Sequence, residues 1–199
     1  MFVRSDDQGA VVSAVNDLLK GYYTPQELRS EAATAPIAYV APAVNGWVGV
    51  YDRQMEDQDT ALAEGIAMDL SNRLKTVVTT FLVHDGDVLM YWLAVDGDII
   101  DRFNSIPDYF DDDFPAEERE ALRGNPRLLA AACDRPEAEA ALREILTDEE
   151  DDAYGLIGRL SAILGMANAD VGFHYLSEPA EPVAGWSEFV AITAGDLKA

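Results

Sequence analysis

The chain has 199 residues, 49% of them hydrophobic and 26% charged, a composition typical of a folded protein with one core rather than of a disordered chain. Its net charge of −23 and isoelectric point of 4.1 argue against nucleic acids and anionic membranes as partners, because binding to phosphates depends largely on lysine and arginine displacing counterions. The charge leaves two interpretations: it confers solubility, or an acidic face recognises a basic partner.

The remaining global features indicate the compartment. The single cysteine, Cys133, cannot form an internal disulfide, which is typical of a reducing environment. Paired aspartates interrupt the first ten residues, so we expect no signal peptide. The longest apolar runs, such as Val88 to Val95, fall far short of the ~20 residues that span a bilayer. We therefore expect a cytoplasmic protein with a single α+β domain over residues 1–199.

The N-terminal quarter of the chain predicts two helices and then two strands. Apolar residues at helical spacing predict a helix over Ala10 to Lys20, which we expect Gly21 to end. Thr24 followed by Pro25 is typical of a helix start, with Thr24 as N-cap. Two strands, Ile37 to Val40 and Trp47 to Tyr51, are expected after it, joined by a turn.

The clearest prediction is an antiparallel meander over Thr76 to Asn104, preceded by an amphipathic helix over Thr60 to Lys75 that Asp57 or Asp59 caps. Two Asp-Gly pairs divide the meander into three strands, because type I′ turns need positive φ at both central residues. The middle strand is apolar on both faces, which predicts that both faces are covered or that it lies centrally. Counting outward from the turns places His84 opposite Asp87, Val83 opposite Val88, and Val95 opposite Asp98.

The stretch from Asp98 to Asp152 is strongly acidic, with 18 acidic residues, 6 arginines and a local net charge of −12. Prolines at three positions predict helix starts within it: Pro115, Pro126 and Pro136. A further helix is expected over Ala153 to Leu164, with Asp151 or Asp152 as cap and Gly165 as its end. The sequence VGFHYL and the stretch Trp186 to Thr193 are predicted as strands.

Together these elements predict an α+β fold. We expect an antiparallel sheet with a central three-stranded meander at about residues 76–104, packed by amphipathic helices. An acidic helical segment at about residues 115–165 completes it. The nearest thing to a boundary between substructures is the stretch 108–115.

Signals for catalysis are weak. The sequence contains no nucleophile elbow, phosphate loop or dinucleotide fingerprint, and Cys133 ends a predicted helix, where the dipole disfavours a thiolate. His84 lies at a strand end beside Asp85 and opposite Asp87, so these three residues are the candidates for an acid–base pair or part of a metal site. The competing interpretation is a solvated hairpin end. The second histidine, His174, is predicted on a separate strand, and nothing brings the two together.

The carboxylate runs at residues 108–113 and 148–152 invite a calcium or magnesium hypothesis, because hard cations prefer oxygen ligands. Neither run follows the EF-hand order, and consecutive side chains point in different directions. We therefore expect no specific metal site and no cofactor.

The most distinctive stretch is RFNSIPDYF, an aromatic loop with an acidic rim that either contacts a partner or folds back over the sheet. The candidate interaction residues are Asp108, Tyr109, Phe110, Asp111, Asp112 and Asp113.

Three functional hypotheses remain. The first, which we favour, is a protein-interaction module of the adaptor or immunity-protein kind that presents an acidic surface to a basic protein. The chain is similar to such proteins in composition only, and it shares no sequence motif with them. The second is a small-molecule hydrolase or metal-assisted enzyme that uses His84, Asp85 and Asp87 together with Asp101 and Asp108. The third is a small-ligand binding domain over the aromatic loop.

Overall fold

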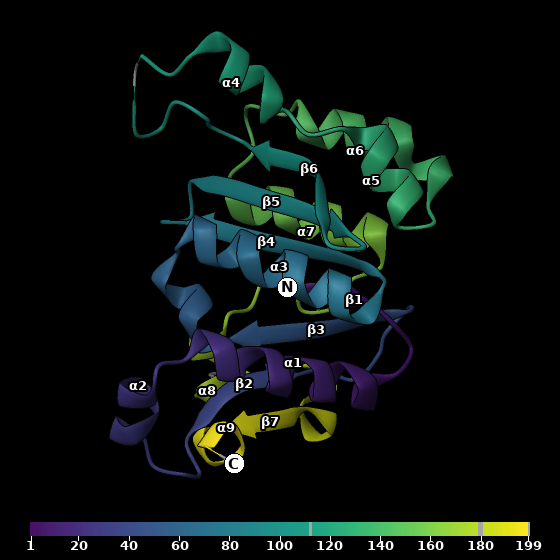
Figure 1. Ribbon diagram of the computed structural model, residues 1–199. Helices are drawn as coiled ribbons and strands as arrows, with labels where there is room; N and C mark the ends of the chain where they lie inside the picture. The colour runs from purple at the N-terminus through teal and green to yellow at the C-terminus, as the bar shows by residue number, and fades with distance from the viewer. Residues whose placement is uncertain (112, 179–180, 199) are drawn as a thin grey trace.

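Seven strands form one antiparallel sheet in the computed structural model, which describes residues 1–111, 113–178 and 181–198 (Figure 1). The predicted α+β fold is confirmed. The strands are β1 (Phe2–Arg4), β2 (Pro36–Val40), β3 (Trp47–Asp52), β4 (Val77–His84), β5 (Val88–Val95), β6 (Asp98–Asn104) and β7 (Val190–Thr193), in the spatial order β6-β5-β4-β1-β3-β2-β7.

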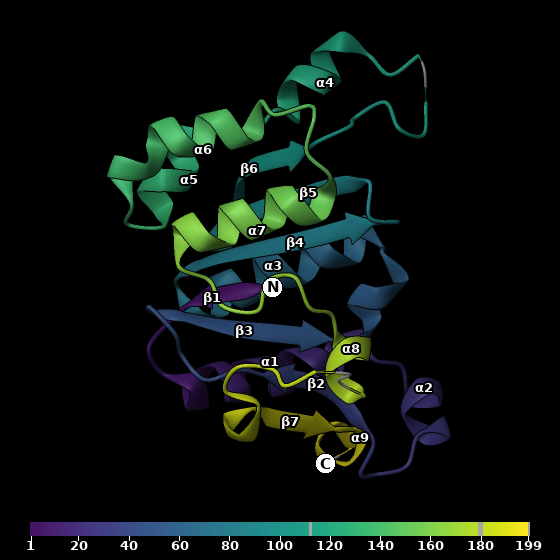
Figure 2. The same cartoon turned by 180° about the vertical axis from the view of Figure 1, so that it is seen from behind.

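Helices of the described residues cover both faces of this sheet (Figures 1 and 2). They are α1 (Gln8–Tyr22), α2 (Pro25–Ser30), α3 (Thr60–Leu74), α4 (Ala116–Ala121), α5 (Pro126–Ala132), α6 (Glu139–Leu146), α7 (Ala153–Leu164), α8 (Phe173–Ser177) and α9 (Ala194–Lys198), with 3-10 turns η1 (Arg53–Asp57), η2 (Pro136–Ala138) and η3 (Trp186–Glu188). Figure 1 shows α1 and α3 on one face, and Figure 2 shows α7 with α5 and α6 on the other. The predicted helical character of residues 115–165 is confirmed.

The predicted meander is present as β4, β5 and β6. Its middle strand is covered on both faces, as its apolar pattern predicts: Trp92 and Leu93 point to opposite faces and are 6% and 0% exposed. The meander occupies one end of the sheet rather than its centre, because β1, β3 and β2 extend the sheet beyond β4 on one side only, which leaves β6 as an edge strand.

The predicted register is wrong at the first Asp-Gly turn and confirmed at the second. His84 pairs with Val88 and Val83 with Leu89, whereas Val95 pairs with Asp98 as expected. Asp85 and Gly86 have the positive φ values of a type I′ turn, 52° and 84°. Asp87, however, donates its N–H to the His84 carbonyl at 3.0 Å and stays outside the ladder, so the first loop contains one more residue than predicted.

Side-chain caps begin most of the longer helices, and the caps predicted at three of them are confirmed. Thr24 and Glu27 form a complete capping box at the start of α2. The Asp59 carboxylate accepts the N–H groups of Ala61 and Leu62 at α3, and Asp152 accepts the Gly155 N–H at α7. The first helix continues through Gly21 to Tyr22 instead of ending at the glycine.

The C-terminal prediction is wrong in one place. Residues Phe173–Ser177 form the helix α8, not a strand, because Phe173 and Leu176 are buried three positions apart, a helical spacing, and the Glu56 carboxylate accepts the His174 N–H at 3.3 Å. The final strand is shorter than predicted: η3 occupies its first part, and β7 pairs with β2. None of the helices in the described ranges is both long and apolar enough to cross a membrane.

Candidate interaction site

The loop between β4 and β5 positions His84 at the end of a strand. Its Nε2 atom lies 3.4 Å from Asp85 Oδ2, and its Nδ1 atom contacts the side-chain oxygen of Gln58. The pairing carboxylate is therefore Asp85 and not Asp87, which the predicted register placed opposite the histidine. The imidazole is partly buried, with 24% of its side chain exposed.

The aromatic loop after β6 folds onto this histidine. The ring centroids of Phe110 and Tyr109 lie 4.9 and 5.8 Å from that of His84, and the two aromatic rings lie 4.9 Å from each other. The Tyr109 hydroxyl donates to Asp87 Oδ2 at 3.3 Å. We call His84, Tyr109 and Phe110 the aromatic patch. Sequence analysis selected these residues as two separate candidate groups, and the structure brings them together.

Phe110 is the most exposed large apolar side chain of the described residues, at 68%. It also lines one wall of a cavity of about 850 Å³ between α3, the β5–β6 face and the aromatic loop. The residues that line this cavity, which we call the Trp92 pocket, include Trp92 and Met90. Phe114 and the Arg102–Glu64 ion pair, with nitrogen–oxygen distances of 2.6 and 3.2 Å, also line it.

The described acidic residues of the aromatic loop are not equivalent. Asp108 pairs with Arg119 at 3.0 Å, so its charge is compensated. Asp111 lines the Trp92 pocket and accepts the Asp113 N–H at 3.0 Å. Within the described ranges, no basic side chain pairs with Asp111 or Asp113. Asp112, the sixth candidate of the loop, lies outside the described residues.

The carboxylates named for the enzyme hypothesis do not converge. Asp87 and Asp108 line one cavity of about 430 Å³, while Asp85 faces another. Asp101 lies elsewhere on β6, where it accepts the Tyr91 hydroxyl at 2.6 Å and the Asn125 N–H at 2.8 Å, and burial raises its pKa. Among the described residues, His84 therefore has one carboxylate partner, and no acid–base pair with a second carboxylate forms around it.

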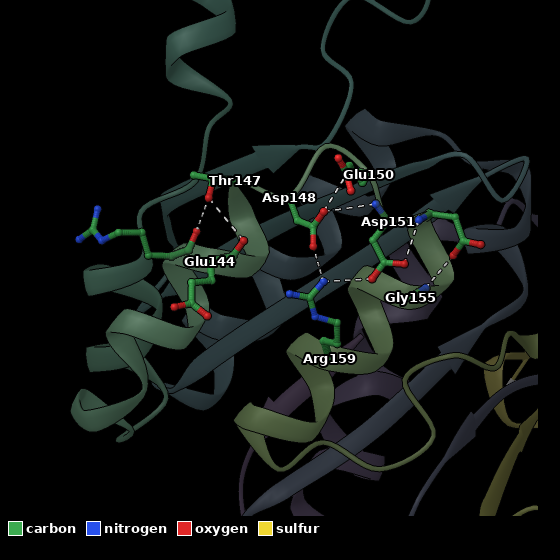
Figure 3. Close-up of polar contacts among 9 residues, drawn as sticks. Glu144, Thr147, Asp148, Glu150, Asp151, Gly155 and Arg159 are labelled. Atoms are coloured by element: carbon green, nitrogen blue, oxygen red, sulfur yellow. Dashed lines mark hydrogen bonds and ion pairs between the residues drawn. The ribbon is translucent and has the colours of Figure 1, made fainter.

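The second acidic run, residues 148–152, is held together by Arg159 (Figure 3). Its guanidinium donates to Asp148 at 2.5 Å and to Asp151 at 3.1 Å, and it lowers the pKa of Asp148. Asp152 is occupied as the cap of α7. The carboxylates of Asp148, Asp151 and Asp152 therefore have structural partners. Across the part of the chain that the structure describes, no group of three or more His, Cys, Asp or Glu side chains could hold a metal ion.

The other titratable candidates lie apart from the patch. Cys133 is fully buried at the end of α5, as its position in the sequence predicts, and burial raises the pKa of its thiol to about 12. A thiol with this pKa is protonated near neutral pH and is a poor nucleophile. His174 lies on α8, where its backbone N–H is paired with Glu56.

Sequence reasoning missed two features of the molecule. The first is the Trp92 pocket, because Glu64 and Arg102 look like ordinary polar positions of a helix and a strand. The second is Asp52, which is only 2% exposed at the end of β3. A single acid directly after an apolar strand was the signal that could have identified it.

No protein-family model, no curated protein and no solved structure matches this chain.

Proposed function

We propose that this protein is an interaction module that binds a basic protein segment through the aromatic patch and the adjoining Trp92 pocket. The observation that carries the proposal is the position of Phe110, an aromatic side chain 68% exposed at the mouth of an apolar pocket. Aromatic side chains that fill or flank pockets dominate the binding energy of protein interfaces.

The order of the patch supports this role. The Phe110 ring contacts both His84 and Tyr109, and Tyr109 is tied to Asp87 by a hydrogen bond. A side chain that is already held in one position loses less conformational freedom when a partner binds. The patch is thus better suited to recognition than an isolated mobile phenylalanine.

The charge around the patch supports a basic partner. Asp85, Asp87, Asp111 and Asp113 lie on the loops that form it, within a chain of net charge −23. Complementary charge accelerates association and excludes acidic competitors. A lysine or arginine side chain suits this site, since its aliphatic stem can lie against Trp92 and Met90 while its charged end reaches Asp111.

A randomised peptide library displayed on phage tests the proposal, because it offers basic, neutral and acidic segments to the protein at the same time. Selection on the wild-type protein should enrich peptides that contain lysine or arginine next to an apolar residue. The same library selected on Phe110→Ala should lose these sequences, whereas Tyr175→Ala, which removes an exposed aromatic ring from α8, should retain them. Enrichment of neutral or acidic peptides, or the same peptides on Phe110→Ala, would overturn the proposal.

A further inference from the structure

Exposed aromatic side chains gather around the turn between β4 and β5. Three of the four exposed aromatic side chains in the described residues lie there: Tyr109 and Phe110, which belong to the aromatic patch, and Tyr154. Tyr154 is the second residue of α7 and is 56% exposed. The fourth, Tyr175, lies on α8. The aromatic patch therefore has a further aromatic neighbour at the same turn.

Tyr154 is held against this turn. A Cβ atom added to Gly86 would lie 3.3 Å from Cε2 of the Tyr154 ring, so the ring packs where the turn has no side chain. The backbones are joined as well, because the Ala153 N–H donates to the Gly86 carbonyl at 3.3 Å. Asp152 fixes the start of α7 by accepting the Gly155 N–H at 2.7 Å. An exposed ring that is already held in place loses less conformational freedom when a partner binds.

The two aromatic sites are close enough to contact one partner. Phe110 contacts His84 at the start of the turn, and Tyr154 contacts Gly86, two residues further along the chain. Two residues span at most about 7 Å, whereas an extended segment of about ten residues spans about 33 Å. Phe110 lines a cavity against α3, and α7 covers the opposite face of the sheet (Figures 1 and 2). A partner that contacts both side chains therefore crosses the turn.

The surface between the aromatic loop and the start of α7 is hollowed. Residues 103–108, residues 146–149 and Asp87 line the cavity of about 430 Å³ that lies there. Arg119 and Arg123 also line it, and each is already paired with a carboxylate, at 3.0 and 2.7 Å. The shape of this region therefore leaves room for side chains of a partner next to Asp87.

The turn itself carries negative charge that no lysine or arginine of the described residues balances. The Asp85 side chain is 69% exposed, and its ion-pair partner is the partly buried His84. Asp87 is exposed and accepts the uncharged Tyr109 hydroxyl. Complementary charge accelerates association and excludes partners of like charge. The turn between the two aromatic sites therefore suits a basic partner.

We propose that the interaction surface continues across the β4–β5 turn to Tyr154, so that one basic partner contacts Phe110 and Tyr154 and places cationic side chains against Asp85 and Asp87. The inference rests on the proposed function and extends it by a second aromatic anchor. Tyrosine is among the residue types that most often dominate binding energy at interfaces. The partner is thus a basic segment long enough to cross the turn, and not one that fills the Trp92 pocket alone.

Peptides of about 16 residues, selected on the wild-type protein from a randomised phage library, are long enough to cross the turn and serve as probes. Their dissociation constants should rise at least fivefold for Tyr154→Ala and at least tenfold for Phe110→Ala. Tyr154→Phe, which keeps the ring, and Tyr175→Ala, which removes an exposed ring from α8, should bind as the wild type does. Shortening a peptide from one end should abolish its dependence on Tyr154 and preserve its dependence on Phe110, because the two anchors contact separate parts of the peptide.

The proposed function and this inference fail in different ways. A library that yields no peptides, or peptides whose affinity for Phe110→Ala stays within twofold of the wild-type value, would overturn both. Peptides that depend on Phe110 but bind Tyr154→Ala within twofold of the wild type would overturn this inference alone. Tyr154→Lys decides the question if Tyr154→Ala does not fold: its aliphatic stem still covers Gly86, and its charge should weaken a basic peptide at least fivefold. Unchanged affinity in that variant contradicts the inference.

Discussion

Replacing Asp52 by asparagine should change how the stability of this protein depends on pH. Burial raises the pKa of Asp52 to about 7. The Gln54 N–H, the Tyr23 hydroxyl, Arg53 and the Met1 α-amino group each lower this pKa, but their effects are smaller than that of burial. An aspartate in an unfolded chain has a pKa of about 3.9. Between these values Asp52 holds a proton in the folded protein that it has lost in the unfolded chain, so the contribution of Asp52 to the free energy of unfolding falls as the pH rises from about 4 to about 7.

The size of the effect follows from the two pKa values. Each unit of difference corresponds to about 1.36 kcal/mol, and between pH 5 and pH 8 the Asp52 contribution should lower the free energy of unfolding by about 2–3 kcal/mol. Asp52→Asn cannot titrate and lacks this contribution. At pH 8 the Asp52→Asn variant should therefore be more stable than the wild type. The gain should be smaller than the full Asp52 contribution, because the new amide group is a buried hydrogen-bond donor, and leaving it without a partner costs about 1–3 kcal/mol.

Urea unfolding of both proteins at several pH values between 5 and 8 measures this difference. The other carboxylates, which also reduce self-repulsion when protonated, are common to both proteins and cancel in the comparison. Asp98→Asn serves as the matched control, since it removes one charge from an exposed position. A stability difference between wild type and Asp52→Asn that stays constant within about 0.5 kcal/mol over this range would refute the reasoning.

Three further predictions concern the core, the thiol and the acidic rim. Leu93→Ala should lower the free energy of unfolding by about 2–5 kcal/mol in urea titrations, because Leu93 is fully buried under a covered face of the sheet; a loss under about 0.5 kcal/mol would show that this face is open. Cys133→Ala should bind the selected peptides as the wild type does, and loss of binding without loss of the fold would give the thiol a function. Replacing Asp111 and Asp113 by asparagine should slow peptide association at low salt while stability stays unchanged or rises slightly, because charges at a rim steer encounters over about 8 Å at physiological ionic strength. Equal association rates for this variant and the wild type would remove the two aspartates from the binding surface.

Local features of the chain were predictable where short-range chemistry decides the structure. The Asp96-Gly97 turn sets the second register of the meander, and Thr24 with Glu27 sets the start of α2, because each depends on residues within one turn. The register at Asp87 was not predictable, because a two-residue and a three-residue loop place the same Asp-Gly pair at positive φ. The stretch at Phe173 is ambiguous in sequence, and its helix is fixed by burial against the sheet.

The sites depend on contacts between distant segments, which explains what the sequence could not predict. His84 and Phe110 were separate candidates, and their contact follows only from how the loop after β6 returns toward the β4–β5 turn. The environment of Asp52 also depends on a distant segment, since its carboxylate accepts the Tyr23 hydroxyl at 3.3 Å. The burial of this carboxylate exists only in the folded protein.

The dissociation constant of one selected basic peptide for three proteins tests the proposed function most directly. Wild type and Tyr175→Ala should bind the peptide equally. Phe110→Ala should bind it at least tenfold more weakly, through faster dissociation, since an anchoring side chain at the centre of an interface acts mainly on the lifetime of the complex. Biolayer interferometry at two salt concentrations gives both rates. A dissociation constant for Phe110→Ala within twofold of the wild-type value would contradict binding at the aromatic patch.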